Sequence, residues 1–171
     1  MLGGAGSGKS DLAERLAVLT GLPRVYLATA EAYDDEMRAK VAAHRASRGP
    51  DWSTQEAPLD LVGALAQAPA GHVVLIDCLT MLLSNHLLAG SDLAGESARL
   101  LGALRDVAGP VVAVSNEVGQ GIVPDNALGR RFRTAQGRLN RDIAAQSALV
   151  IGVMAGLPFA LKGPLPEEIA Q

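Results

Sequence analysis

The residues best suited to do chemistry stand at the start of the chain, in the run Gly3-Gly4-Ala5-Gly6-Ser7-Gly8-Lys9-Ser10. This run matches the pattern G-x-x-x-x-G-K-[ST] at every fixed position, and an apolar helical pattern follows it directly. Glycines let backbone N–H groups wrap a phosphate at a helix N-terminus, Lys9 supplies a positive charge, and the Ser10 hydroxyl is a suitable Mg²⁺ ligand. The run predicts a phosphate-binding loop rather than a plain glycine-rich turn.

A second chemical element is the apolar run 73–76, which ends in Asp77. In proteins with a phosphate-binding loop, a carboxylate at the end of such a strand helps to hold Mg²⁺ opposite the serine hydroxyl. We therefore expect Ser10 and Asp77 to share a metal ion, although a strand-ending aspartate that merely begins a turn is the alternative. The neighbouring Cys78 is interpreted as a small, buried side chain rather than a nucleophile.

His44 lies on an expected helix over 35–48, where it continues an apolar face. A histidine in such a place is usually structural. Lys40 and Arg48 stand four residues before and after it, and Arg45 is adjacent, so cations surround the imidazole and favour its neutral form. A neutral imidazole can attack phosphorus without a base to remove a proton. Both interpretations of His44 stay open on the residues alone.

The elements that must position these residues alternate along the chain. Short apolar runs predict strands over 24–28, 73–76, 111–114 and 149–154, and amphipathic stretches predict helices over 10–19, 35–48, 59–66, 94–107 and 127–146. The expected fold is a three-layer α/β domain of the P-loop NTPase type with a mainly parallel sheet, spanning 1–171 as one unit. We expect residues after Lys162 to form a tail.

Only Met1 and Leu2 precede the glycine loop, so the first strand is expected to be truncated, with the true start further upstream.

The composition of the chain argues against several classes of protein. The 171 residues carry 18 acidic and 15 basic side chains, 49% are hydrophobic and 3% aromatic, and there is a single cysteine. We therefore expect no broad nucleic-acid-binding surface, no membrane span and no internal disulfide. We expect a cytoplasmic location.

The motifs together resemble the bifunctional adenosylcobinamide kinase / adenosylcobinamide-phosphate guanylyltransferase family of cobalamin biosynthesis. The resemblance runs from Gly3 to about Lys162. It rests on the phosphate loop and on five further groups of residues in family order: Tyr26 to Ala30 with Asp35 to Met37, His44-Arg45 with Arg48, Trp52 and Thr54 to Pro58, Asp77 to Thr80 with Asn85, Ser115 to Pro124, and Arg131, Phe132, Arg133, Gly137 and Asn140. The segment Ser115 to Pro124 is the most specific, because no generic kinase requires it.

The resemblance implies two linked activities on adenosylcobinamide and adenosylcobinamide phosphate, with ATP or GTP as phosphoryl donor and GTP as the source of GMP. It implies that Lys9 and His44 are catalytic, His44 as the residue that takes GMP. It implies a recombinase-ATPase-like fold and a homo-oligomer, usually a trimer. The implied nucleotide contacts are Gly3, Gly4, Ala5, Gly6, Ser7, Gly8, Lys9, Ser10, Thr29, Ala30, Glu31, Arg45, Ala46, Ser47, Arg48, Glu56 and Asp77.

Several features keep two interpretations. The segment Ser115 to Pro124 is either an ordinary strand-to-helix loop or a substrate loop. The cations Arg130, Arg131 and Arg133 form either a solvated helix face or an anion site. Trp52 is expected to pack rather than stack on a base. At the level of function, a small-molecule kinase with a structural His44 and a nucleotide-dependent switch or recombinase-like binding module are the alternatives.

Overall fold

Six parallel strands and one antiparallel strand form a sheet in the order β3-β2-β4-β5-β1-β6-β7. The computed structural model describes residues 1–30, 49 and 51–170. The strands are β1 (Leu2–Gly3), β2 (Arg24–Ala28), β3 (Trp52–Glu56), β4 (Val73–Asp77), β5 (Val111–Asn116), β6 (Val150–Met154) and β7 (Leu157–Lys162). The helix predicted over 35–48, with His44, lies outside the described residues.

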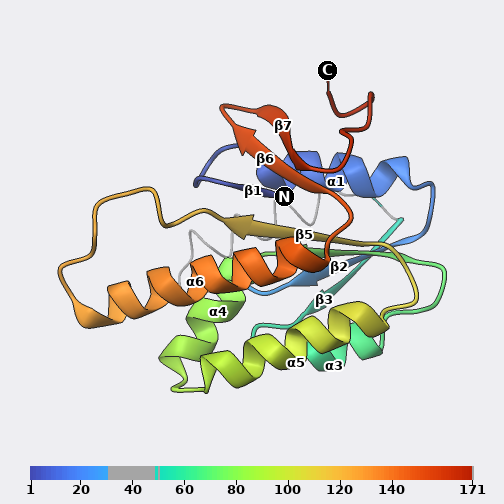
Figure 1. Cartoon of the computed structure of the whole chain (residues 1–171). Coiled ribbons are helices and arrows are strands. Elements are labelled where there is room, and N and C mark those ends of the chain that lie inside the picture. Colours follow the sequence, from blue (N-terminus) through green and yellow to red (C-terminus); the bar gives the residue numbers. More distant parts are fainter. Residues whose placement is uncertain (31–48, 50, 171) are drawn as a thin grey trace.

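Helices cover both faces of this sheet (Figure 1). They are α1 (Lys9–Leu19), α3 (Leu61–Ala66), α4 (Leu79–Leu88), α5 (Leu93–Asp106) and α6 (Ala127–Gln146). Successive residues of β4 point to opposite faces, as a pleated strand requires. Val73 and Leu75 pack with Ala13 and Ala17 of α1, whereas Val74 and Ile76 pack with the other four helices. The predicted three-layer α/β architecture is confirmed.

Two strands and one helix of the described structure were not predicted from the sequence. β3 is polar and, among the described strands, pairs with β2 alone, so it lacks the continuous apolar run of a buried strand. α4 is apolar around most of its circumference and shows little amphipathic contrast, because seven of its ten residues are buried. β7 turns back on β6 through Ala155 and Gly156, both with positive φ, which is the geometry of a two-residue hairpin turn.

The residues after Lys162, which we expected to form a tail, have no helix or strand but pack against the domain. Ile169 is fully buried and packs with Leu12 of α1 and with Ile151 and Val153 of β6. The Arg15 guanidinium donates to the Glu168 carbonyl at 2.9 Å. One isoleucine without periodic neighbours gives no recognisable pattern in the sequence, yet it closes the apolar groove between α1 and β6.

The strand that leads into the glycine loop is central but short. Leu2 pairs with Ser115 of β5 and with Gly152 of β6, and the register continues at Gly3. Beside Leu2, a cavity of about 550 Å³ separates the first halves of β5 and β6, lined by side chains such as Val111, Ala113 and Ile151. Within the described residues, no helix has the length and apolar character needed to cross a bilayer.

Candidate active site

The glycine loop connects β1 to α1 and presents the N-terminus of that helix. Gly6 and Gly8 have φ values of 67° and 89°, the left-handed region that glycine enters without strain. Gly8 is the N-cap residue of α1, and no side chain accepts a hydrogen bond from the first turn. A Cβ at Gly3 would overlap the Val153 carbonyl oxygen, so the loop passes tightly against β6. The first turn of α1 is therefore open to an anion.

Lys9 is folded over this loop. Its side chain is buried, and Nζ donates to the Gly4 carbonyl at 2.6 Å and to the Ser7 hydroxyl at 3.4 Å. Burial lowers the pKa of the Lys9 ammonium, and negative charge at Cys78 and Asp77 acts in the opposite direction. Among the described residues Lys9 Nζ makes hydrogen bonds to neutral oxygens, and a phosphate placed in the loop would supply an anionic partner.

Asp77 ends β4, two strands away from β1, which corresponds to about 10 Å at the usual strand spacing. One carboxylate oxygen accepts a hydrogen bond from the Tyr26 hydroxyl at 3.1 Å, which fixes its orientation. Ser10 is the second residue of α1 and is half-buried. A carboxylate and a hydroxyl are hard oxygen donors, which fit Mg²⁺.

No group of three or more His, Cys, Asp or Glu side chains with metal-binding spacing occurs in the described part of the chain.

Thr29 and Cys78 join the ends of β2 and β4. The Thr29 hydroxyl donates to the Cys78 carbonyl at 2.6 Å and accepts from the Cys78 N–H at 2.7 Å. Thr29 is fully buried, so its hydroxyl positions the chain after Asp77. Its predicted contact with nucleotide stays a prediction. Burial raises the pKa of the Cys78 thiol, which agrees with its interpretation as a small packed side chain.

The other predicted nucleotide contacts fall into two groups. Ala30 follows Thr29, and Glu56 ends β3 in an exposed position, so both lie at the edge where the parallel strands end. The remaining ones lie outside the described residues: Glu31, His44, Arg45, Ala46, Ser47 and Arg48.

The predicted substrate segment continues as the loop 117–126 between β5 and α6, and two of the three candidate cations hold it. Arg130 donates to the Pro124 and Asp125 carbonyls at 3.0 and 2.7 Å. Arg133 donates to the Gly119 and Gly121 carbonyls. Arg131 is exposed. In this structure Arg130 and Arg133 bind backbone oxygens of the loop, a role that was not predicted, and a role in anion binding stays a prediction.

A polar network that the sequence did not reveal fixes the start of that loop. Gln136 of α6 is fully buried and donates to the Ser115 hydroxyl and the Asn140 amide oxygen, both at 2.9 Å. Asn140 donates to the Asn116 carbonyl at 3.0 Å, and the Asn116 N–H donates to the Thr80 hydroxyl at 2.8 Å. The spacing of Gln136 and Asn140, four residues apart on one helix face, was the available signal.

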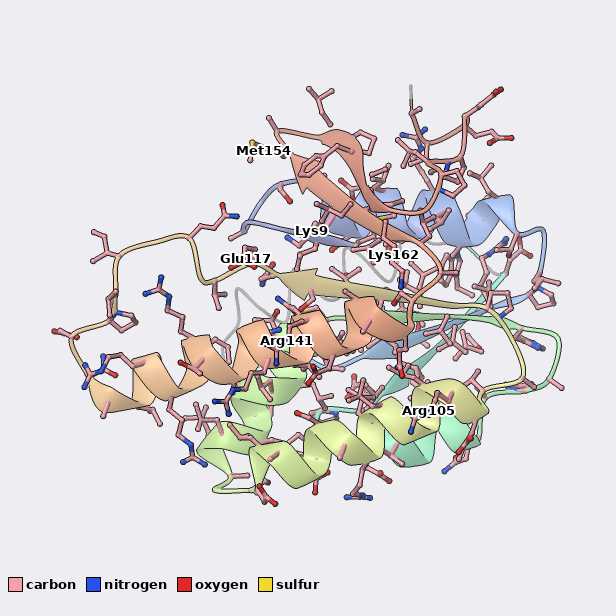
Figure 2. The ribbon with its side chains drawn as sticks, in the orientation of Figure 1. Lys9, Arg105, Glu117, Arg141, Met154 and Lys162 are labelled. Atoms are coloured by element: carbon pink, nitrogen blue, oxygen red, sulfur yellow. The ribbon has the colours of Figure 1, made fainter. Side chains whose placement is uncertain are left out.

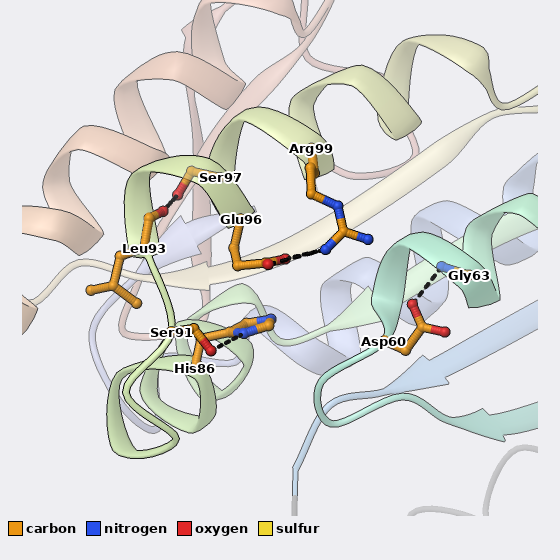
Figure 3. A network of polar contacts seen from close by, with 8 residues as sticks. All are labelled: Asp60, Gly63, His86, Ser91, Leu93, Glu96, Ser97 and Arg99. Carbon is orange, nitrogen blue, oxygen red and sulfur yellow. Dashed lines mark hydrogen bonds and ion pairs between the residues drawn. The ribbon is translucent and has the colours of Figure 1, made fainter.

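Two aromatic side chains are structural. Trp52 packs edge-to-face on Tyr26, with ring centroids 6.2 Å apart, and the Arg24 guanidinium lies 5.5 Å from the Trp52 ring centroid, which confirms packing. His86 is buried between α3, α4 and α5, and its Nδ1 lies 3.2 Å from the Ser91 hydroxyl (Figure 3). Both lie away from the glycine loop.

The glycine loop, the buried Lys9 and the position of Asp77 with one strand between it and β1 define a nucleotide-binding α/β protein of the P-loop class. The chain belongs to the cobinamide kinase / cobinamide phosphate guanyltransferase family, whose model matches residues 1–161. The resemblance drawn from the motifs is thereby confirmed.

Curated relatives carry names that agree with this family. The bifunctional adenosylcobalamin biosynthesis protein CobP of Pseudomonas aeruginosa is 47% identical over 166 residues, which cover 95% of this chain and 96% of the relative. The proteins named CobU of Salmonella typhimurium and Escherichia coli are 36% and 35% identical, each over 94% of this chain and 97% of the relative.

The predicted pair of activities, adenosylcobinamide kinase and adenosylcobinamide-phosphate guanylyltransferase, is that of this family and is confirmed. Both reactions use nucleoside triphosphates as substrates. A switch or recombinase-like binding module has no support in these relationships.

Proposed function

We propose that this chain carries out both family reactions at one site that binds a nucleoside triphosphate. In the kinase step, the glycine loop and Lys9 hold a nucleoside triphosphate, and the aminopropanol hydroxyl of adenosylcobinamide attacks the γ-phosphorus. The β–γ bridging bond breaks and the nucleoside diphosphate leaves. Positioning and charge neutralisation supply most of the rate in such transfers. The buried Lys9 ammonium, bonded to the loop that receives the phosphates, is the observation that carries this proposal.

In the guanylyl-transfer step, we assign the nucleophile to His44, on the family resemblance. The imidazole lone pair attacks the α-phosphorus of GTP and pyrophosphate leaves. The phosphate of adenosylcobinamide phosphate then displaces GMP from the histidine, which gives adenosylcobinamide-GDP. Imidazole needs no base for its attack, so this step makes different demands on the protein from the kinase step.

Ser10 and Asp77 would hold Mg²⁺ with the triphosphate. The ion would neutralise phosphate charge in both steps. The Tyr26 hydroxyl keeps the Asp77 carboxylate in one orientation, and Thr29 fixes the backbone that follows it. The homo-oligomer that the family resemblance implies, usually a trimer, stays a prediction.

Mass spectrometry of the corrinoid products tests this proposal. With ATP and adenosylcobinamide the full chain should add one phosphoryl group, and on addition of GTP it should convert that product to adenosylcobinamide-GDP. Lys9→Ala should lose both conversions, because both need the triphosphate held in place. A chain that hydrolyses triphosphate but modifies no corrinoid would contradict the proposal.

A further inference from the structure

The kinase step needs a group that accepts a proton, whereas the attack of an imidazole in guanylyl transfer does not. A hydroxyl that becomes a phosphate ester must lose its proton, whereas an imidazole attacks through a lone pair. The general base of the kinase step would be a carboxylate or an imidazole beside the glycine loop.

Among the described residues, carboxylates occur at the ends of three parallel strands at this edge of the sheet. Asp77 ends β4, Glu56 ends β3, and Glu117 follows directly after β5. In the strand order, β3 is four positions from β1, or about 19 Å, and β4 is two positions away, or about 10 Å. β5 is the immediate neighbour, at about 5 Å.

Glu117 and Lys9 are bound to consecutive carbonyl groups of the glycine loop. The Glu117 N–H donates to the Gly3 carbonyl at 3.0 Å, and Lys9 Nζ donates to the Gly4 carbonyl at 2.6 Å. Figure 2 shows both side chains at the same edge of the sheet. The lysine of this loop pattern reaches the β- and γ-phosphates, so the backbone of Glu117 is bonded to the loop that would hold the reacting phosphoryl group.

The Glu117 carboxylate is available to a substrate. One of its oxygens, Oε1, accepts from the Gly119 N–H, which orients the group, and the side chain is half-buried. Its other oxygen has no hydrogen-bond partner within the described residues. A carboxylate with one anchored and one free oxygen is the arrangement a general base requires.

The backbone around Glu117 is held from two helices. Asn116 accepts from Asn140 of α6 and donates to Thr80 of α4, and Arg133 binds the Gly119 carbonyl. The fully buried Gln136 closes this network on Ser115. Such support fixes a side chain more tightly than a mobile loop would, which is what proton transfer in a defined geometry needs.

We propose that Glu117 is the general base of the kinase step. Its free carboxylate oxygen accepts the proton of the aminopropanol hydroxyl as that oxygen bonds to the γ-phosphorus and the β–γ bridging bond breaks. The proton remains on Glu117 until solvent takes it, and the nucleoside diphosphate departs. This inference rests on the proposed kinase activity, and it assigns Glu117 no part in the attack of His44 on GTP.

The test compares two half-reactions in the full chain. Single-turnover phosphorylation of adenosylcobinamide is measured with saturating ATP, and self-guanylylation is measured with GTP alone. Glu117→Gln, which keeps an oxygen to accept from Gly119, should slow phosphorylation by roughly 10²-fold or more. Self-guanylylation should keep its wild-type rate. Asp106→Asn, which removes an exposed charge at the end of α5, should leave both rates unchanged.

A second variant separates proton transfer from loop geometry. In Glu117→Ala, added formate should restore part of the phosphorylation rate, because a small carboxylate can occupy the vacated place. Wild-type phosphorylation in Glu117→Gln, an equal loss of both half-reactions, or no restoration by formate would each overturn the inference. A wild-type chain that never phosphorylates adenosylcobinamide would instead overturn the proposed function on which the inference rests.

Discussion

The Thr29 hydroxyl and the backbone of Cys78 exchange two hydrogen bonds, at 2.6 and 2.7 Å, across 49 residues of sequence. The same hydroxyl thus acts as donor and acceptor in a fully buried position. The Asn85 amide reaches the same place from α4 and donates to the Thr29 carbonyl at 2.9 Å. These contacts fix the residue that follows Asp77, so Thr29 after β2 and Asn85 of α4 together support the backbone next to the candidate metal ligand.

Thr29→Val keeps the volume of the side chain but removes its hydroxyl. The Cys78 N–H would then lose its partner beside a buried side chain, whereas the Cys78 carbonyl keeps the Leu82 N–H. We expect the free energy of unfolding to fall by roughly 1 to 3 kcal/mol. Urea denaturation measures this loss. Thr29→Ser, which keeps the hydroxyl, is the control; equal stability of the two variants would show that the paired bonds contribute little.

Ser10 and Asp77 are proposed to share one Mg²⁺. Ser10→Ala and Asp77→Asn should each weaken Mg²⁺-dependent turnover, and the double variant should lose much less than the sum of the two losses. Titration of both activities with Mg²⁺ in the four proteins of this cycle gives the coupling. Fully additive losses would argue against a shared metal ion.

Arg133 holds the Gly119 and Gly121 carbonyls of the loop 117–126. Charge-assisted hydrogen bonds of this kind contribute roughly 1.5 to 3 kcal/mol, so Arg133→Ala should release the loop. If the loop contacts corrinoid, the KM for adenosylcobinamide should rise roughly tenfold, which corresponds to 1.4 kcal/mol, while self-guanylylation by GTP is retained. The exposed Arg131 supplies the matched control, Arg131→Ala, and an equal effect of the two substitutions would exclude loop positioning as the cause.

Ile169 packs between α1 and β6, although a tail was predicted for its segment. Ile169→Ala should lower the free energy of unfolding by roughly 2 to 5 kcal/mol, because the vacated space lies between packed side chains. Leu161 of β7 is 55% exposed, so Leu161→Ala should change it by only about 0.5 kcal/mol. Thermal or urea unfolding compares the two variants. A negligible effect of Ile169→Ala would show that the segment after Lys162 does not stabilise the domain.

The sequence predicted the parts of the site that depend on fixed local patterns. The glycine loop and the strand ending in Asp77 each have a spacing that their chemistry imposes, so both are recognisable from the residues alone. Most strands and helices followed from apolar periodicity, and α6 was predicted with its observed bounds. The exposed β3 and the apolar α4 were missed because neither shows the contrast that periodicity detects.

The supporting network was not predicted, for a different reason. Ser115, Gln136 and Asn140 are polar residues of ordinary type, and their bonds depend on how α6 lies across the end of β5. The same holds for Glu117, whose place beside Gly3 follows from strand order rather than from its neighbours in sequence. Tertiary placement, not local pattern, determines which of many polar side chains meet at the glycine loop.

The most direct test of the two-activity account uses GTP labelled at the α-phosphate, followed by mapping of the labelled residue. The wild-type chain should form an acid-labile, base-stable adduct at His44, as expected of a phosphoramidate. His44→Ala should form no adduct and should still phosphorylate adenosylcobinamide, because that step depends on Lys9, Ser10 and Asp77. An adduct that persists in His44→Ala, or a wild-type chain that never forms one, would contradict the assignment and leave a kinase with a structural His44.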